Sequence, residues 1–180
     1  MYDDKELISR ILNGELSAFS LLVNQHEKLV VHMIGRIVQR LEDREDICQE
    51  VFLKVYKNLA SFKFQSKLST WIAQIAYGTA IKHLKKYNNK PLNDLLDLED
   101  RHSTDVNPEN ILAKKDYYKF LHAEINKLPL QYKVVLTLYH LNEFSYQEIE
   151  EITGMPSGTV KNYLFRARKL LKDNLEKHLK

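Results

Sequence analysis

The residues best suited to binding chemistry lie in a helix predicted over residues 157–177. At about 100° per residue, its apolar side chains gather on one face and its basic and amide side chains on the opposite face. The polar face carries Lys161, Asn162, Phe165, Lys169 and Lys172, with Arg166 and Arg168 at its edges. A phenylalanine within a basic face can contact a thymine methyl group while the cations contact phosphates or base edges. This pattern predicts a helix that reads the major groove of duplex DNA.

The residues before this helix support the same interpretation. Ser145 and Glu148 have the spacing of a capping box, which predicts a short helix over about 145–153 that ends at Gly154. Ser157 is expected to be the N-cap of the longer helix that follows. A short helix, a turn with glycine and a longer basic helix together form the helix-turn-helix pattern.

A second candidate surface begins after residue 60, where aromatic residues alternate with lysines. Phe62 and Phe64 are interleaved with lysines in a predicted loop that continues to Lys67, and Trp71 and Tyr77 follow in a helix. Aromatic rings stack on unpaired bases while ammonium groups follow the phosphates, so this segment suits single-stranded nucleic acid. The alternative is that Trp71 and one of the two phenylalanines belong to the core.

The helix predicted over about 43–59 has an acidic face and an apolar face. Its core positions recur every four residues and are Ile47, Val51, Val55 and Leu59. Its other face carries Glu42, Asp43, Asp46, Gln49, Glu50 and Leu53. Crowded carboxylates suit a basic partner surface, although a solvated acidic face is the plain alternative.

The elements that must position all these side chains are helices. Only five Gly and four Pro interrupt the 180 residues, and no segment alternates apolar and polar residues as a half-buried strand would. Helices are predicted over about residues 7–12, 17–38, 43–59, 70–86, 111–128, 131–141, 145–153 and 157–177. The prediction is an all-α fold of two small helical domains, residues 1–88 and 111–180, joined by a flexible acidic linker over residues 89–110.

Charge and composition narrow the possible functions. The net charge is +4 over residues 1–90, −5 over residues 91–110 and +4 over residues 111–180, and this local basic excess indicates a polyanionic partner. The one cysteine, Cys48, rules out an internal disulfide, and the histidines lack metal-ligand spacing, so neither metal nor cofactor is expected. Without a long apolar run or a signal-peptide core, a cytoplasmic protein with no membrane insertion is expected.

Taken together, the motifs resemble the extracytoplasmic-function (ECF) sigma factors, which are promoter-recognition subunits of bacterial RNA polymerase. The matching segments are ELISRILNGELSAFSLLV, DREDICQEVFLKVYKNLASF, STWIAQIA, NPEN and LPLQYKVVLTLYHLNEFSYQEIEEITGMPSGTVKNYLFRARKLL. The resemblance covers nearly the whole chain. Each segment is moderately specific by itself, and their shared order and spacing make the resemblance strong.

The resemblance implies a protein that binds core RNA polymerase and directs promoter opening and transcription initiation, without being an enzyme. The first domain would be sigma region 2, and its core polymerase-binding residues would be Asp43, Asp46, Gln49, Glu50 and Leu53. The opened −10 strand would contact Phe62, Phe64, Lys67, Ser69, Thr70, Trp71, Tyr77, Gly78 and Lys82. The second domain would be sigma region 4, and its −35 contacts would be Tyr146, Ser157, Thr159, Lys161, Asn162, Phe165, Arg166, Arg168 and Lys169. A separate anti-sigma factor is the expected regulator.

The chain departs from the family pattern at a few of these positions. Gly78 stands where the family usually has Asn, so it lacks the side-chain amide that would read a −10 base. Tyr77 or Gln74 stands in place of Arg or a similar residue, and Tyr163 replaces a common Arg near the −35 contacts.

Two other function classes fit parts of the sequence. A stand-alone helix-turn-helix regulator would use the C-terminal helices alone and would leave the segment from Phe62 to Trp71 unexplained. A helical-bundle metalloenzyme needs two Glu-x-x-His motifs that face the bundle core. The one such motif here, Glu99 to His102, lies in the predicted linker.

Overall fold

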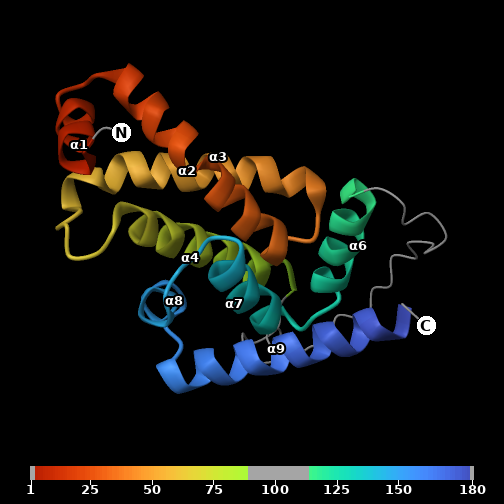
Figure 1. Cartoon of the computed structure of the whole chain (residues 1–180). Helices are drawn as coiled ribbons and strands as arrows, with labels where there is room; N and C mark the ends of the chain where they lie inside the picture. Colours follow the sequence, from red (N-terminus) through yellow and green to blue (C-terminus); the bar gives the residue numbers. More distant parts are fainter. Residues whose placement is uncertain (1–2, 89–113, 179–180) are drawn as a thin grey trace.

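The computed structural model describes residues 3–88 and 114–178, and both segments are built from helices, as predicted. The first segment contains α1 (Asp4–Leu12), α2 (Leu16–Ile37), α3 (Leu41–Asn58), the short 3-10 helix η1 (Leu59–Ser61) and α4 (Leu68–Asn88). The second contains α6 (Lys114–Asn126), α7 (Leu130–His140), α8 (Tyr146–Thr153) and α9 (Ser157–His178) (Figure 1). The predicted linker over residues 89–110 lies outside the described residues, so both predicted domain boundaries stay predictions.

In the first unit, α2, α3 and α4 pack against one another, and α1 packs against α2. The apolar positions of α3 are buried as their spacing predicts: Val51 and Val55 are 0% exposed and Ile47 is 3% exposed. Fully burying each such side chain stabilises the fold by roughly 1.5–3 kcal/mol. The chain turns from α1 into α2 at Gly14, whose φ of 90° favours glycine.

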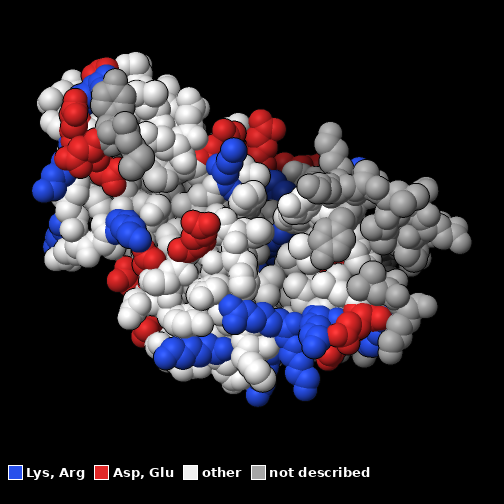
Figure 2. Space-filling view, in the orientation of Figure 1, with Lys and Arg blue, Asp and Glu red and all other residues white. Residues whose placement is uncertain are grey.

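In the second unit, α9 packs along α7, with α8 at one end of the contact and α6 at the other. Val160, Leu164 and Ala167 face this core and are at most 1% exposed, in agreement with the predicted apolar face of the helix. The opposite side of α9 faces solvent. Figure 2 shows Lys and Arg side chains gathered along the edge of the molecule that α9 forms in Figure 1.

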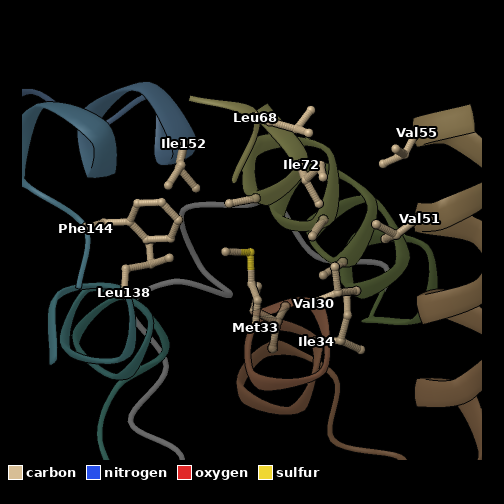
Figure 3. Packing of buried hydrophobic residues seen from close by; sticks show 14 of the residues in the cluster. Val30, Met33, Ile34, Val51, Val55, Leu68, Ile72, Leu138, Phe144 and Ile152 are labelled. Carbon is tan, nitrogen blue, oxygen red and sulfur yellow. The ribbon is translucent and has the colours of Figure 1, made fainter. Parts of the chain in front are cut away.

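The two units are packed together rather than splayed apart, a point that the sequence leaves open. Helix α7 lies against α2, and α8 lies against α4. Met33 from the first unit and Leu138, Phe144 and Ile152 from the second are all buried in one continuous hydrophobic cluster (Figure 3). The predicted linker therefore connects two units whose cores merge.

A buried arginine joins the two units next to this cluster. Arg36 of α2 is 9% exposed, and its guanidinium donates to Thr137 Oγ1 at 3.2 Å and to Asn126 Oδ1 at 2.5 Å. Its third contact is His122 Nδ1, at 2.5 Å. A buried charge needs such hydrogen bonds, so these three uncharged partners on α6 and α7 help to fix how the units sit together.

Within the described residues, no helix combines the length and the apolarity needed to cross a bilayer.

Candidate functional site

Local sequence signals fix the turn that carries α9. Ser145 Oγ accepts from the Glu148 backbone N–H at 3.3 Å, and Glu148 Oε2 accepts from the Ser145 backbone N–H at 2.8 Å. These bonds confirm the predicted capping box. Gly154 then ends α8 in the left-handed region, with φ 71°, where a side chain would be strained.

The start of α9 agrees with the predicted range, but the residue that caps it differs from the prediction. Helix α9 begins at Ser157, and the Pro156 carbonyl accepts from the backbone N–H groups of Thr159 and Val160 at 2.8 and 3.0 Å. Because the residue whose carbonyl accepts the first helical bond is the N-cap, the cap is Pro156. The prediction that Ser157 is the N-cap was therefore wrong, and Ser157 is the first residue of the helix.

The outer face of α9 forms one continuous basic surface. Its exposed members from the predicted −35 set are Lys161, Asn162, Phe165, Arg166, Arg168 and Lys169. The other three members, Tyr146, Ser157 and Thr159, are partly buried. Phe165 is 68% exposed among these cations, and the basic edge is visible in Figure 2. Exposed amides, cations and one ring on a single helix face can contact both phosphates and base edges.

The predicted −10 residues divide into a loop cluster and a strip along α4. In the cluster, Phe62 is 9% exposed, and its ring centroid lies 4.9 Å from that of Phe64 and 5.2 Å from that of Trp71. Phe64 is 45% exposed and adopts φ 56°, an uncommon conformation for a bulky residue that often marks functional sites. The alternative that one phenylalanine belongs to the core holds for Phe62, and Trp71 is partly buried and packs against the same core.

A recess of about 340 Å³ lies beside this aromatic cluster. Its lining residues are Ser61, Phe62, Lys63, Gln65, Ser66, Trp71 and Gln74 from the first unit and Glu151 from α8. The walls combine ring faces with amide and hydroxyl groups, which is the chemistry that can hold an unstacked base.

The strip along α4 follows from helical geometry. Trp71, Gly78 and Lys82 lie at intervals of seven and four residues, so they share one face of α4. Gly78 is exposed, and a Cβ added there would meet nothing within 4 Å. Tyr77 points elsewhere: it packs against the core cluster, and burial raises the pKa of its hydroxyl to about 12.

Helix α8 engages part of the predicted −10 surface. Glu148 Oε1 lies 2.9 Å from Lys67 Nζ and accepts from Thr70 Oγ1 at 3.3 Å. Thr70 is itself 1% exposed, and Ser69 is partly buried. The roles of Glu148 and Glu151 here could not be predicted from sequence, because no periodicity links positions about 80 residues apart. The one local signal at Glu148 was its place in the capping box.

Hydrogen bonds explain why the pKa of Glu148 is low. Burial by itself raises the pKa of this carboxyl group, but the bonds from Ser145 and Lys67 outweigh it and lower the pKa to about 2. Glu148 is therefore a carboxylate at neutral pH, and it contacts the Lys67 ammonium group as a DNA phosphate could.

The predicted polymerase-binding residues lie along α3. Asp46, Gln49 and Glu50 are exposed, and Leu53 is 57% exposed beside them. Asp43, in the first turn of α3, is partly buried and lies close to α4. Its Oδ2 atom is buried, 3.9 Å from His83 Nε2 and 3.7 Å from Arg40 Nε.

A groove of about 770 Å³ adjoins the α3 strip. It lies between α2 and α3, and its apolar lining comes from Phe19, Val23, Val31, Leu41, Cys48, Phe52 and Leu53. The α2 side of this groove was not among the predicted binding residues. The available signal was an excess of apolar residues on α2, such as Val31, which is 48% exposed.

Comparison with known proteins assigns the family. The Sigma-70 region 2 model matches residues 22–90, and the Sigma-70, region 4 model matches residues 121–171. The chain is 33% identical to the ECF RNA polymerase sigma-E factor of Haemophilus influenzae, over 96% of this chain and 95% of that protein.

Two solved structures share the fold. CnrH in complex with the cytosolic domain of CnrY matches with a TM-score of 0.69 at 17% identity, over 97% of both chains. The sigma factor RpoE in complex with the anti-sigma factor NepR from Bartonella quintana matches with a TM-score of 0.66 at 21% identity, over 88% of this chain and 96% of that one. With two region models in the expected order and 33% identity over nearly its full length, the chain belongs to the ECF sigma factors of RNA polymerase.

Proposed function

We propose that this sigma factor reads a −35 duplex with the outer face of α9, captures the opened −10 strand with the aromatic cluster and α4, and docks on core polymerase through α3. The observation that carries the proposal is Phe165, which is 68% exposed within the basic face of α9. A helix that was merely solvated would gain nothing from this ring. The chain would bind and position DNA without a cofactor. It would not be an enzyme, because the phosphodiester chemistry belongs to the polymerase.

The packing of the two units determines whether the opened −10 strand can reach its predicted binding surface. Lys67 and Thr70 contact Glu148, and Glu151 lines the recess beside Trp71. An incoming strand would have to displace α8 from these groups. The −10 contacts would therefore form after the two units separate, and binding to polymerase is the event that would hold them apart.

Strand capture has to offset the cost of unstacking. Extruding a base costs a few kcal/mol, and one base stacked on a ring recovers about 1–3 kcal/mol. Phe64 and Trp71 offer ring surface beside the recess. Promoter opening would thus be driven by binding energy and would not require ATP hydrolysis.

Run-off transcription with purified core polymerase over a randomised promoter library tests the whole proposal. The wild-type chain should enrich paired −35 and −10 elements. Lys161→Ala should weaken −35 binding and reduce base discrimination by about 1–3 kcal/mol if Lys161 contacts a base edge. An unchanged base preference in this variant would remove Lys161 from the reading residues.

The same assay distinguishes a sigma factor from the alternative function. A stand-alone helix-turn-helix regulator would bind specific duplex DNA without polymerase and would not stimulate transcription. Gly78→Asn adds a side-chain amide where space is open, so it should sharpen the −10 preference of a sigma factor and leave a regulator's duplex preference unchanged.

Docking on polymerase is tested by reversing charge on α3. Asp46→Arg combined with Glu50→Arg should abolish co-purification with core enzyme, because it turns an exposed acidic strip into a basic one. Asp3→Arg combined with Glu6→Arg is the matched control, since it makes the same charge change at exposed positions of the first unit. Normal co-purification of the α3 variant would refute this docking site.

Two further properties follow from the proposed function. The chain would act in the cytoplasm, where bacterial RNA polymerase transcribes. It would also be held inactive by a separate anti-sigma factor, in line with the partner named for its structural relative RpoE. Co-purification from cells before and after envelope stress would reveal such a partner.

A further inference from the structure

We propose that Tyr139, Tyr146 and His140 are positioning residues that hold Lys161 and Arg168 in place for DNA binding. The inference rests on the proposed −35 function of α9. It adds Tyr139 and His140 of α7, which no sequence pattern assigns to the site. It also gives Tyr146 a second role, as the residue that supports Lys161.

Two stacked tyrosines form the centre of the arrangement. The ring centroids of Tyr139 and Tyr146 are 5.2 Å apart, and the two planes are inclined by only 18°. Tyr139 lies in α7 and Tyr146 is the first residue of α8. The stack therefore ties together the two helices on which α9 rests.

A cation from α9 lies over each ring. Lys161 Nζ is 5.8 Å from the centroid of Tyr146, and Arg168 Cζ is 5.2 Å from the centroid of Tyr139. Both distances are within the range of cation–π attraction. The contacts run in the order Lys161, Tyr146, Tyr139, Arg168, so each cation has its own ring.

The spacing along α9 matches this order. Lys161 and Arg168 are seven residues apart, so they lie on one side of the helix about 10 Å from each other. Lysine and arginine side chains lose considerable rotamer freedom when they are fixed by a ligand. Rings that already restrict the two side chains would reduce that loss, and both cations remain exposed to DNA.

His140 adds a hydrogen bond that orients Arg168. Arg168 Nε donates to His140 Nε2 at 3.1 Å, which requires that this ring nitrogen is unprotonated. Burial and the neighbouring Arg168 lower the pKa of His140, which favours that state. With its Nε–H directed to His140, the guanidinium keeps its two terminal NH₂ groups free to donate to phosphate oxygens.

Tyr139 also packs against the core cluster, so a test must separate positioning from simple stability. Tyr139→Leu removes the ring but keeps an apolar side chain, and Tyr139→Phe keeps the ring. Both are made in the full chain and measured well below their melting temperatures. The ligand is the −35 duplex that the wild-type chain selects from the library.

Three measurements distinguish a positioning role of Tyr139 from a purely structural role. In Tyr139→Leu, the ring-current shifts of the Arg168 side-chain protons should disappear from the NMR spectrum. Affinity for the duplex should fall about three- to tenfold. The plot of log association constant against log salt concentration should become less steep by about 1, as expected when one phosphate contact is lost. Tyr139→Phe should match the wild type in all three. A purely structural role would lower the melting temperature and leave the salt slope of the folded protein unchanged.

A double-mutant cycle completes the test. If Tyr139 acts through Arg168, then Arg168→Ala should cost much less affinity in the Tyr139→Leu background than in the wild type. Additive losses would overturn the inference while leaving the −35 function intact, and so would a Tyr139→Leu variant with wild-type binding. If the wild-type chain selects no duplex, the proposed function fails, and the positioning role fails with it.

Discussion

At the scale of single residues, the helical period in the sequence predicted which side of α9 is buried and which side is available for binding. The structure adds the exposed fraction of each side chain. Val160 and Leu164 are at most 1% exposed, whereas Phe165, one position further on, is 68% exposed. Such a contrast between neighbours follows from a rotation of about 100° per residue. Phe165 can therefore be replaced without disturbing the core.

We expect Phe165→Ala to weaken binding to the selected −35 duplex by roughly tenfold, equivalent to about 1.4 kcal/mol, with an unchanged melting temperature. The loss should concentrate at a thymine position, because the ring would contact a methyl group there. The measurement is equilibrium binding to duplexes that differ at single base pairs. Leu170→Ala is the control, since Leu170 is a partly exposed apolar residue of the same helix; an equal loss in both variants would contradict a specific role for Phe165.

Glu148 provides a pH-dependent prediction. Its pKa is lowered to about 2 in the folded protein by the hydrogen bonds from Ser145 and Lys67 that outweigh burial, whereas its ordinary value is 4.5. The unfolded chain thus binds the proton more readily, so stability from this group is present above about pH 4.5 and is lost as the pH falls toward 2. Thermal unfolding from pH 6 to pH 2 should show a weaker acid dependence for Glu148→Gln than for the wild type. Parallel curves would contradict this contribution.

At the scale of elements, the turn between α8 and α9 was predicted from sequence almost completely. The capping box and the left-handed glycine are local signals, and both are present. The predicted cap, Ser157, lies one residue too late, because the Pro156 carbonyl accepts the first helical hydrogen bonds. The angle at which α9 leaves α8 depends on Gly154.

We expect Gly154→Ala to destabilise the protein by about 1–2 kcal/mol, because a Cβ at φ 71° is strained even in open space. For a chain of this size, that change lowers the melting temperature by roughly 2–8 °C. Gly158→Ala is the matched control: it also has open space, and it lies within α9 without a positive φ. Its melting temperature should stay the same or rise slightly, and an equal decrease in both variants would show that the backbone conformation is not the cause.

At the scale of the whole molecule, the contact between the two units decides which surfaces are accessible. Arg36 donates to three uncharged acceptors on α6 and α7, and one of them is His122 Nδ1. A protonated imidazole cannot accept this bond. Burial, Arg36 and His32 of α2 lower the pKa of His122 from its ordinary value of 6.5.

The packed arrangement should therefore weaken on acidification. The hydrogen bond from Arg36 requires a neutral His122, which is favoured above about pH 6.5. The stabilisation that this bond gives to the contact between the units is therefore lost as the pH falls below that value. Small-angle X-ray scattering should show a larger radius of gyration for the wild type at pH 5.5 than at pH 7.5. His122→Gln keeps an acceptor that does not titrate, so its curve should be flatter. A wild-type radius that is independent of pH would contradict the prediction.

The sequence alone determined the helices, their buried faces, the helix-turn-helix and the basic and acidic surfaces, because these features depend on side chains within one or two helical turns of each other. Only the tertiary structure decided that the two units share a core and that Glu148 holds Lys67 and Thr70. It also decided that Asp43 is partly buried close to His83, that Tyr77 packs against the core, and that Tyr139 lies under Arg168. These contacts join different helices, and some join residues far apart in the chain. Helical periodicity specifies which face of a helix is buried, but the packing of the whole core selects the neighbour that buries it.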